Sequence, residues 1–306
     1  MKRIICTLII ISGVALQLKA QKLIVATYNI RNANKSDSLE GNGWGQRLPQ
    51  IAGLIRFNDF EVFGTQEVLH HQLTDLLADL PGYGYVGVGR DDGKEKGEYA
   101  AIFFKKDRLD TIKSGHFWLS PITDRPNRAW DAALPRICTW AYFKDKQSRL
   151  KFWYFNLHMD HKGVLARKNS TLVVLSKIKE LTHGEPVILT GDFNMDQTSE
   201  SYSTIDQSGM LRDAFELAEI RYASNGTFNA FNTNLETKSR IDHIFITKNI
   251  NVKRYGILTD TYRSAITDST QIRSGNFPKE YSFQHSQART PSDHFPVKVE
   301  LNFSVK

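Results

Sequence analysis

The sequence predicts a mixed α/β domain in which mixed β-sheets are flanked by helices. Segments rich in β-branched and aromatic residues alternate with amphipathic segments of helical period. In the middle of the chain, strand follows strand with no helix between them, which argues against a simple doubly wound parallel sheet. No repeat, low-complexity tract or linker interrupts residues 21–306, so we expect one domain there.

The expected strands are short runs rich in Val, Ile, Phe, Tyr and Trp. In chain order they are Leu23–Ile30, Glu61–Gln66, Tyr83–Val88, Tyr99–Lys105, Ile112–Trp118, Ile137–Phe143, Leu150–His158, Pro186–Thr190, Arg240–Thr247, Asn251–Ile257 and Phe295–Phe303.

Helices are expected over Arg47–Phe57, His70–Leu80 and Leu165–Leu181. In the last of these, apolar residues that include Leu172 recur at helical spacing and indicate a face packed on the core. The polar segment Thr259–Ser292 is expected to be a long loop, and long loops in compact domains are often functional.

The first twenty residues have the layout of a secretory signal peptide. Lys2 and Arg3 precede an apolar run, Ile4–Leu18, and Ala20 offers a small residue at a cleavage point. The run is short for a transmembrane span, although a retained membrane anchor is the alternative. We therefore expect residues 1–20 to be removed, leaving a periplasmic or secreted protein without stable membrane insertion.

The composition is that of a soluble globular protein, with 41% hydrophobic and 24% charged residues. Residues 1–20 carry three basic and no acidic residues, so their removal lowers the formal net charge from +7 to +4. This mild charge permits an anionic substrate but excludes the strong field of a nucleic-acid coat protein. Cys138 is then the one remaining cysteine, which excludes an internal disulfide, and its apolar surroundings predict a buried packing residue.

The strongest local signal is the segment Leu189–Asn194, where an apolar run ends in Gly-Asp-Phe-Asn. At the end of a buried strand, alternation points Asp192 and Asn194 to the same side. A carboxylate there can act as a general base on water, while the amide donates a hydrogen bond to a phosphate oxygen. The alternative is a plain turn. A calcium loop is excluded, because its required glycine and glutamate are missing at Gln197 and Ser203.

Other acids also stand at expected strand ends. Asp293 and His294 open the last strand, where the carboxylate can bind Mg²⁺ and the imidazole can orient or deprotonate water, unless the pair merely turns the chain. Glu67 and Asp242 interrupt apolar runs, and a buried carboxylate is costly unless it is paired or bound to metal. A metal ion explains Glu67 better, whereas Asp242 is equally suited to a histidine partner, with an ion pair to Arg240 as the alternative.

Asn29 and His158 each end an apolar strand. Asn29 can steer a carboxylate or a phosphate oxygen, or simply cap a turn. His158 is followed by Asp160 and His161, but a zinc site is disfavoured because no cysteine or matching histidine pair supplies further ligands. An imidazole that faces a phosphate and stabilises charge is preferred.

Together these strand-end residues carry a family resemblance across nearly the whole expected mature chain. In order they are Asn29, Glu67, His158, Asp192, Asn194, Asp242, Asp293 and His294. The set resembles the endonuclease/exonuclease/phosphatase (deoxyribonuclease-I-like) superfamily. Further segments, Gly89–Lys94, Gly97–Tyr99, Leu134–Trp140 and His158–Gly163, look like a secreted bacterial branch near the nocturnin-like members. The resemblance implies a four-layer α/β/β/α sandwich with two packed mixed β-sheets.

The same resemblance implies a Mg²⁺-dependent phosphoesterase, with Mn²⁺ as an alternative ion. It places the metal on Glu67, with Asn29 and Asp293 helping from the sides.

The resemblance also implies the catalytic roles. Asp192 would act on the attacking water, Asn194 would hold the phosphate, and His158 would face the scissile group. Asp242 would orient His294, and the order of proton transfers between Asp192 and His294 is left open.

The substrate is less sharply indicated. Arg90, Lys94 and Arg136 are candidates for contact with a second phosphate, with ordinary solvated basic residues as the alternative. Arg31 stands where abasic-site endonucleases carry an acid, and the inositol-phosphatase signature is absent around Asp242, which disfavours both substrates.

The first expectation is therefore a monomeric nuclease acting on nucleic acid, for example a 3′-exonuclease. A phospholipid or sphingomyelin phosphodiesterase is second, a sugar-phosphate phosphatase is third, and an inactive binding module is the remote alternative.

Overall fold

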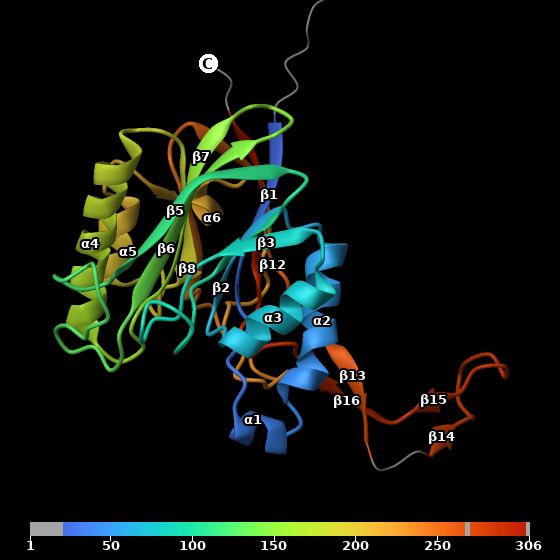
Figure 1. The fold of residues 1–306 in the computed structure, drawn as a ribbon. Helices are drawn as coiled ribbons and strands as arrows, with labels where there is room; N and C mark the ends of the chain where they lie inside the picture. The colour runs from blue at the N-terminus through green and yellow to red at the C-terminus, as the bar shows by residue number, and fades with distance from the viewer. Residues whose placement is uncertain (1–20, 267–269, 304–306) are drawn as a thin grey trace, which may run out of the picture.

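The computed structural model describes residues 21–266 and 270–303. The expected signal peptide, residues 1–20, lies outside the described residues. Two large β-sheets form the centre of the molecule, and helices cover their outer faces (Figure 1). The expected four-layer sandwich is confirmed.

Seven strands form the first sheet, in the order β10-β12-β17-β1-β2-β4-β3. Their bounds are β1 Gln21–Asn29, β2 Val62–Gln66, β3 Tyr83–Val86, β4 Ile102–Lys105, β10 Ile220–Tyr222, β12 Ile250–Ile257 and β17 Val297–Phe303. Within this sheet β1 runs parallel to β2 and antiparallel to β17, so the sheet is mixed.

Six strands form the second sheet, in the order β5-β6-β7-β8-β11-β9. Their bounds are β5 Leu109–Trp118, β6 Ile137–Asp145, β7 Lys151–His158, β8 Val187–Asp192, β9 Arg212–Asp213 and β11 Asp242–Ile246. This sheet is also mixed, because β7 and β8 are parallel whereas β6 and β11 run antiparallel to them.

The helices lie on the two outer faces, with α2 and α3 on the side of the first sheet and α4 and α5 on the side of the second (Figure 1). Their bounds are α1 Lys35–Leu39, α2 Trp44–Phe57, α3 His70–Asp79, α4 Val164–Thr182, α5 Glu200–Asp206 and α6 Ala214–Leu217. No helix in the described part of the chain is long and apolar enough to cross a membrane.

Strand alternation distributes the apolar residues between two sides of each sheet. On β1, Leu23 and Val25 pack between the sheets, where they meet Tyr154 and Ile188 of the second sheet. Ile24 and its alternating neighbours on β1 face α2 and α3 instead. Both faces of the central strands are therefore buried, which explains their continuous apolar runs.

The strands and helices expected from the sequence are present, with ends that agree within three residues. Leu172 is an exception to the predicted packing, because it lies on the exposed side of α4. Val174 and Ile178 lie on the opposite side of the helix and pack against the core.

The segment expected to be a long loop instead forms two small ribbons that extend from the body (Figure 1). Strand β13 (Tyr262–Ala265) pairs with β16 (Ser286–Arg289), and β14 (Gln271–Ile272) pairs with β15 (Phe283–Gln284). These strands are mostly solvent-exposed on both faces, so no apolar alternation marks them in the sequence.

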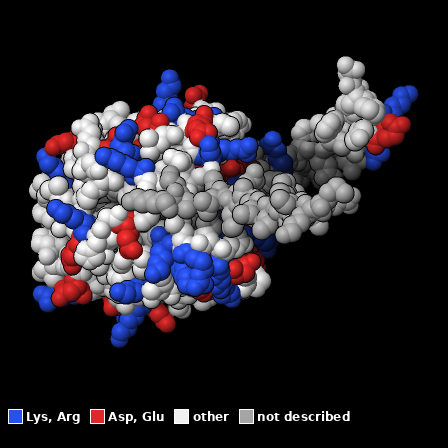
Figure 2. All heavy atoms as spheres, turned by 90° about the horizontal axis from the view of Figure 1, so that it is seen from above, with Lys and Arg blue, Asp and Glu red and all other residues white. Residues whose placement is uncertain are grey.

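Both ends of the described chain lie at one end of the sandwich (Figure 1). Viewed from that end, Lys and Arg side chains are interspersed with Asp and Glu side chains (Figure 2). The residues singled out from the sequence lie at the opposite end.

Candidate active site

Strand direction gathers the predicted residues at one edge of the two sheets. Asn29 ends β1 and Glu67 directly follows β2, and these strands are parallel. His158 and Asp192 end β7 and β8, which are also parallel and pair these two residues in register. Four strands therefore deliver polar side chains at their carboxyl ends.

The antiparallel strands complete the same edge from their amino ends. Asp242 begins β11 and pairs with Asp192 in the ladder. Asp293 and His294 lie just before β17, which runs antiparallel to β1. The chain thus brings together residues up to 265 positions apart, such as Asn29 and His294.

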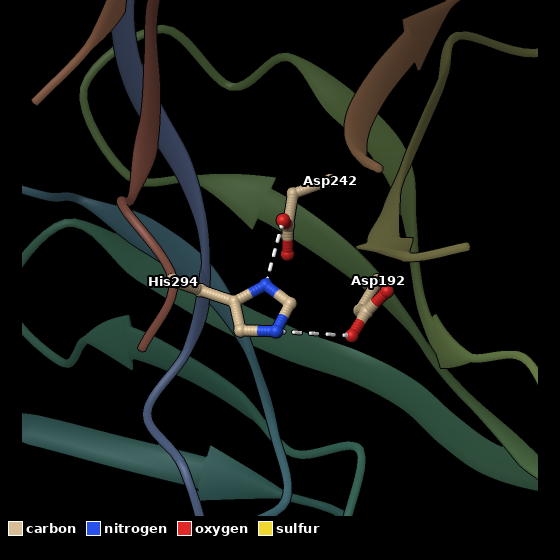
Figure 3. A group of neighbouring side chains, drawn as sticks. All are labelled: Asp192, Asp242 and His294. Carbon is tan, nitrogen blue, oxygen red and sulfur yellow. Dashed lines mark hydrogen bonds and ion pairs between the residues drawn. The ribbon is translucent and has the colours of Figure 1, made fainter. Parts of the chain in front are cut away.

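His294 lies between two carboxylates (Figure 3). Its Nδ1 is 2.9 Å from Oδ2 of Asp242, and its Nε2 is 3.8 Å from Oδ2 of Asp192. Burial opposes the charged imidazole, but Asp242 and Asp192 outweigh it and raise the pKa of His294 well above its usual value. Of the two roles left open for Asp242, the structure provides the histidine partner; Arg240 pairs with Asp213 instead.

Asp192, Asp242 and His294 offer ligand atoms within 4.8 Å of one another, a spacing that would also suit a metal ion. The Asp242–His294 hydrogen bond already engages two of these atoms, so a proton-handling group is the better description. Burial, and then the charge of Asp242, raise the pKa of Asp192 to about 7. A carboxyl group of this kind can both accept and release a proton near neutral pH.

Asn194 reaches the cavity by a turn rather than by strand alternation, so that part of the prediction is wrong. Strand β8 ends at Asp192, and Asn194 has a φ of 50°. Its backbone N–H donates to Oδ1 of Asp192 at 2.9 Å, and its side-chain Nδ2 donates to the carbonyl oxygen of Met159 at 3.0 Å. The segment after β8 therefore does form the turn given as the alternative, and the same turn places Asn194 at the cavity.

Glu67 and Asp293 lie on either side of one cation, the guanidinium of Arg31. Nη1 of Arg31 is 3.8 Å from Oε2 of Glu67 and 3.5 Å from Oδ2 of Asp293. Burial raises the pKa of Asp293, and the charge of Glu67 raises it further. The Nδ2 of Asn29 donates to both Glu67 and Asp192, at 3.1 and 2.9 Å. Asn29 therefore connects the Glu67 and Asp293 pair to the carboxylate of Asp192.

This donor set fits a hard divalent cation. Two buried carboxylates already share a positive group, and carboxylate and amide oxygens are the ligands that Mg²⁺ and Mn²⁺ accept. Glu67 and Asp293, with Asn29 beside them, are the residues that would hold the ion.

A cavity of about 390 Å³ opens over these groups. The residues that line it are Arg31, Asn32, Glu67, Arg90, Glu98, Leu134, Arg136, His158, His161, Asp192, Asn194, Phe228, Ile241, Asp293 and His294. Burial, followed by the charges of Arg136 and Arg90, lowers the pKa of His158 well below its usual value and favours the neutral imidazole.

The three basic residues expected to contact phosphate lie in different positions relative to the cavity. Arg90 and Arg136 are buried and line the cavity. Lys94 does not reach it: the turn at Gly93, with a φ of 69°, leaves Lys94 exposed. Cys138 is fully buried, as expected.

Sequence reasoning missed several residues of the cavity. Glu98 accepts a hydrogen bond from Asn32 and pairs with Arg90, yet it was noted only as part of a resembling segment. Phe228 packs edge-on against His294, with ring centroids 5.0 Å apart, and nothing in its local sequence indicates this. Both sets of contacts include residues that are distant in the sequence, so they become visible only in the folded structure.

The fold and the cavity together define a hydrolase of phosphoric esters, with buried carboxylates and imidazoles at one end of a two-sheet sandwich. A model described as "Endonuclease/Exonuclease/phosphatase family" matches residues 26–294, and the chain belongs to that family. The resemblance stated from the sequence is confirmed.

Solved structures show the same relationship. The chain is 54% identical to a mannosyl-6-phosphatase of Bacteroides thetaiotaomicron, with a TM-score of 0.85, covering 92% of this chain and 100% of that one. It is 52% identical to another family member from that organism, with a TM-score of 0.87 and coverage of 94% and 100%. The human nocturnin catalytic domain shares the fold, at 18% identity, a TM-score of 0.64 and coverage of 92% and 94%.

Proposed function

We propose that the protein is a divalent-cation-dependent phosphatase that hydrolyses the phosphate monoester of a sugar. The observation that carries this proposal is the 54% identity to a mannosyl-6-phosphatase over almost the whole of both chains. The sugar-phosphate alternative, third among the expectations from the sequence, therefore moves ahead of the nuclease.

The rim of the cavity supports a sugar as the leaving group. Phe228 and Leu134 are 42% and 40% exposed and line the cavity. A sugar ring presents C–H groups on its faces and hydroxyl groups around its edge, so apolar side chains can pack against those faces. Phe228 lies directly against His294, which places this platform next to the catalytic imidazole.

The metal site belongs to the same proposal. Glu67 and Asp293 would hold Mg²⁺ or Mn²⁺, with Asn29 beside them. When bound, the ion supplies positive charge that stabilises the phosphoryl oxygens. Arg31 also pairs with Asp37 at 2.8 Å, so its guanidinium would keep a carboxylate partner at the cavity wall with the ion in place.

The chain's own residues divide the remaining work. Asp192 accepts the proton of the attacking water, because its pKa of about 7 suits a base at neutral pH. Asp242 holds Nδ1 of His294, so that Nε2 faces Asp192 and the cavity. The charged His294 stabilises the developing negative charge and gives a proton to the sugar oxygen as its P–O bond breaks, and the neutral His158 donates a hydrogen bond to a phosphoryl oxygen.

The experiment is a substrate panel with purified protein. Mannose 6-phosphate, p-nitrophenyl phosphate, bis(p-nitrophenyl) phosphate, single-stranded DNA and sphingomyelin are each assayed with Mg²⁺, with Mn²⁺ and with EDTA. We expect phosphate release from the monoesters, strongest for the sugar, and none in EDTA. Hydrolysis of DNA or sphingomyelin without hydrolysis of the monoesters would overturn the substrate assignment. Activity that persists in EDTA would overturn the role of the metal.

Export is a separate part of the proposal. The basic residues, apolar run and small residue within positions 1–20 are the features that an export machinery reads. We expect the protein in the periplasm or medium to begin near Gln21, as measured by intact mass. Cytoplasmic protein of full mass alone would contradict this.

A further inference from the structure

Arg136 has a buried guanidinium that is only partly hydrogen-bonded. Its Nε donates to Oδ2 of Asp160 at 3.2 Å, and its Nη2 lies 2.9 Å from Nδ1 of His161. Its Nη1 is also buried, and no described residue accepts a hydrogen bond from it. The residue is 5% exposed and lines the cavity. A buried charged donor without an acceptor is costly, so the expected acceptor is a bound ligand.

Arg90 approaches the same cavity from the turn after β3. Its Nη1 is 2.6 Å from Oε2 of Glu98, whereas its buried Nε has no hydrogen-bond acceptor among the described residues and lies 3.9 Å from Oδ1 of Asp91. Glu98 Oε2 in turn lies 3.8 Å from Nδ1 of His158. Arg90, Arg136 and His158 all line the same cavity.

The two ester classes differ in what they offer these donors. A phosphate monoester presents three non-bridging oxygens and a charge between about −1.5 and −2 at neutral pH. A diester presents two such oxygens and one negative charge, and its third position carries an organic group. The third oxygen and the extra negative charge of a monoester can satisfy the buried N–H groups of Arg136 and Arg90, whereas the organic group of a diester leaves an N–H there without an acceptor.

On this basis, and resting on the proposed phosphatase function, we propose that Arg136 and Arg90 bind non-bridging oxygens of the transferring phosphate and select monoesters over diesters. The second phosphate expected from the sequence is not needed to explain them. His161 holds the guanidinium group of Arg136 in place, and Glu98 holds that of Arg90. Both arginines thus touch the reacting phosphate rather than a distant part of the substrate.

Removing the Arg136 guanidinium should not unfold the protein. Its partner Asp160 accepts hydrogen bonds from four backbone N–H groups, those of Ala133, Leu134, Lys162 and Gly163. The carboxylate therefore stays satisfied in an Arg136→Met variant. A matched control is Arg108→Met, because Arg108 pairs with Asp145 at 2.8 Å at the opposite end of β6.

The test compares kcat/KM on p-nitrophenyl phosphate and on bis(p-nitrophenyl) phosphate, with saturating Mg²⁺. We expect Arg136→Met to lose on the order of 100-fold on the monoester, as for the loss of a charge-assisted hydrogen bond in a buried site, and less than about 5-fold on the diester. Arg136→Lys should recover part of the monoester rate, and Arg108→Met should leave both rates unchanged. Equal losses on the two esters in Arg136→Met would overturn the proposal.

Binding provides a readout that does not depend on turnover. Titration calorimetry of the Mg²⁺-loaded protein with inorganic phosphate should show at least about 10-fold weaker binding in Arg136→Met, with dimethyl phosphate unaffected. If the wild-type protein fails to hydrolyse any monoester, the proposed function fails but this titration still tests the arginines. Unchanged phosphate affinity in both Arg136→Met and Arg90→Met would overturn the inference by itself.

Discussion

The Nδ1 atom of His294 lies 2.9 Å from Oδ2 of Asp242, and this contact determines which ring nitrogen faces the cavity. With Nδ1 bound to a buried carboxylate, Nε2 is directed toward Asp192 (Figure 3). A carboxylate in this position both selects the tautomer and stabilises the charged imidazole. The pair is therefore the most sensitive point of the proposed mechanism.

We expect Asp242→Asn to lower kcat by about two to four orders of magnitude, because an amide can present its N–H to Nδ1 and leave the wrong tautomer. The pKa of His294 should also fall, since Asp242 is the main influence that raises it. Phosphate release measures kcat, and the NMR titration of the His294 ring measures the pKa. A kcat within 10-fold of wild type in a folded variant would contradict the assigned role.

Glu67→Gln tests the metal site. The substitution removes one of two buried acids that share Arg31, so the metal-free protein should lose no stability and can gain some. The Tm increase that Mg²⁺ gives the wild-type protein should disappear, because binding to the folded state alone produces that increase. Differential scanning fluorimetry with Mg²⁺ and with EDTA measures both effects.

Glu61→Gln is the matched control for this variant. Glu61 lies at the other end of β2, where it accepts a hydrogen bond from the N–H of Ile24 at 2.7 Å. It should keep the full Mg²⁺-dependent increase in Tm. An equal Mg²⁺ response in Glu67→Gln and the wild-type protein would remove Glu67 from the metal site.

Arg47 provides a different kind of test, of positioning rather than contact. It is fully buried, and its guanidinium donates to four backbone carbonyl oxygens, those of Ile30, Arg31, Asn42 and Pro291. Two of these belong to the chain leaving β1 after Asn29, and Pro291 precedes Asp293. Arg47 therefore ties together the two loops that carry proposed metal-binding residues.

We expect Arg47→Lys to reduce stability by about 3 kcal/mol or more, since a lysine leaves some of these carbonyls unpaired at about 1–3 kcal/mol each. It should also weaken Mg²⁺ binding at least 10-fold, measured by calorimetry well below the Tm. Arg108→Lys is the control, because it perturbs the partner of the buried Asp145, which lies remote from the cavity. A destabilised Arg47→Lys variant with unchanged Mg²⁺ affinity would reduce Arg47 to a structural role.

The core strands were predictable because burial imposes a pattern on the sequence. Alternation on β17, or continuous apolar residues on β8, marks a strand whether or not its neighbours are known. The strand-end acids were predictable for the complementary reason: Glu67 and Asp242 are charges in apolar surroundings, and such charges need a partner.

What escaped prediction depends on contacts between distant segments. Glu98 looks like any surface glutamate until Arg90, Asn32 and His158 are placed around it. Lys94 carries the same charge as Arg90, and only the conformation of the turn at Gly93 separates them. Strands β13 and β16 are stabilised by the hydrogen bonds of their pairing and not by burial of apolar residues, so the hydrophobic pattern of the sequence does not predict them.

The buried pair of Asp213 and Arg240 makes stability depend on acid pH. Nη1 of Arg240 is 2.7 Å from Oδ2 of Asp213, which also accepts from the Tyr202 hydroxyl at 2.9 Å. Burial opposes the charged carboxylate, but His243 and Arg240 outweigh it and hold the pKa of Asp213 well below its usual range. Its stabilisation is therefore fully present above the unfolded-state pKa of about 4 and is lost as pH falls below that value.

We expect Asp213→Asn to unfold about 3–5 kcal/mol more easily than the wild type at pH 7, because Arg240 is then buried without its partner. The difference should shrink as pH falls below about 4, because the Asp213 carboxylate of the unfolded wild-type chain then takes up a proton while the folded one stays charged. Urea unfolding followed by tryptophan fluorescence at pH 7 and pH 3 measures both values. Glu219→Gln, which removes an exposed partner of Lys253, should stay close to wild type at both pH values. A difference that stays constant with pH would show that Asp213 acts through packing and not through its charge.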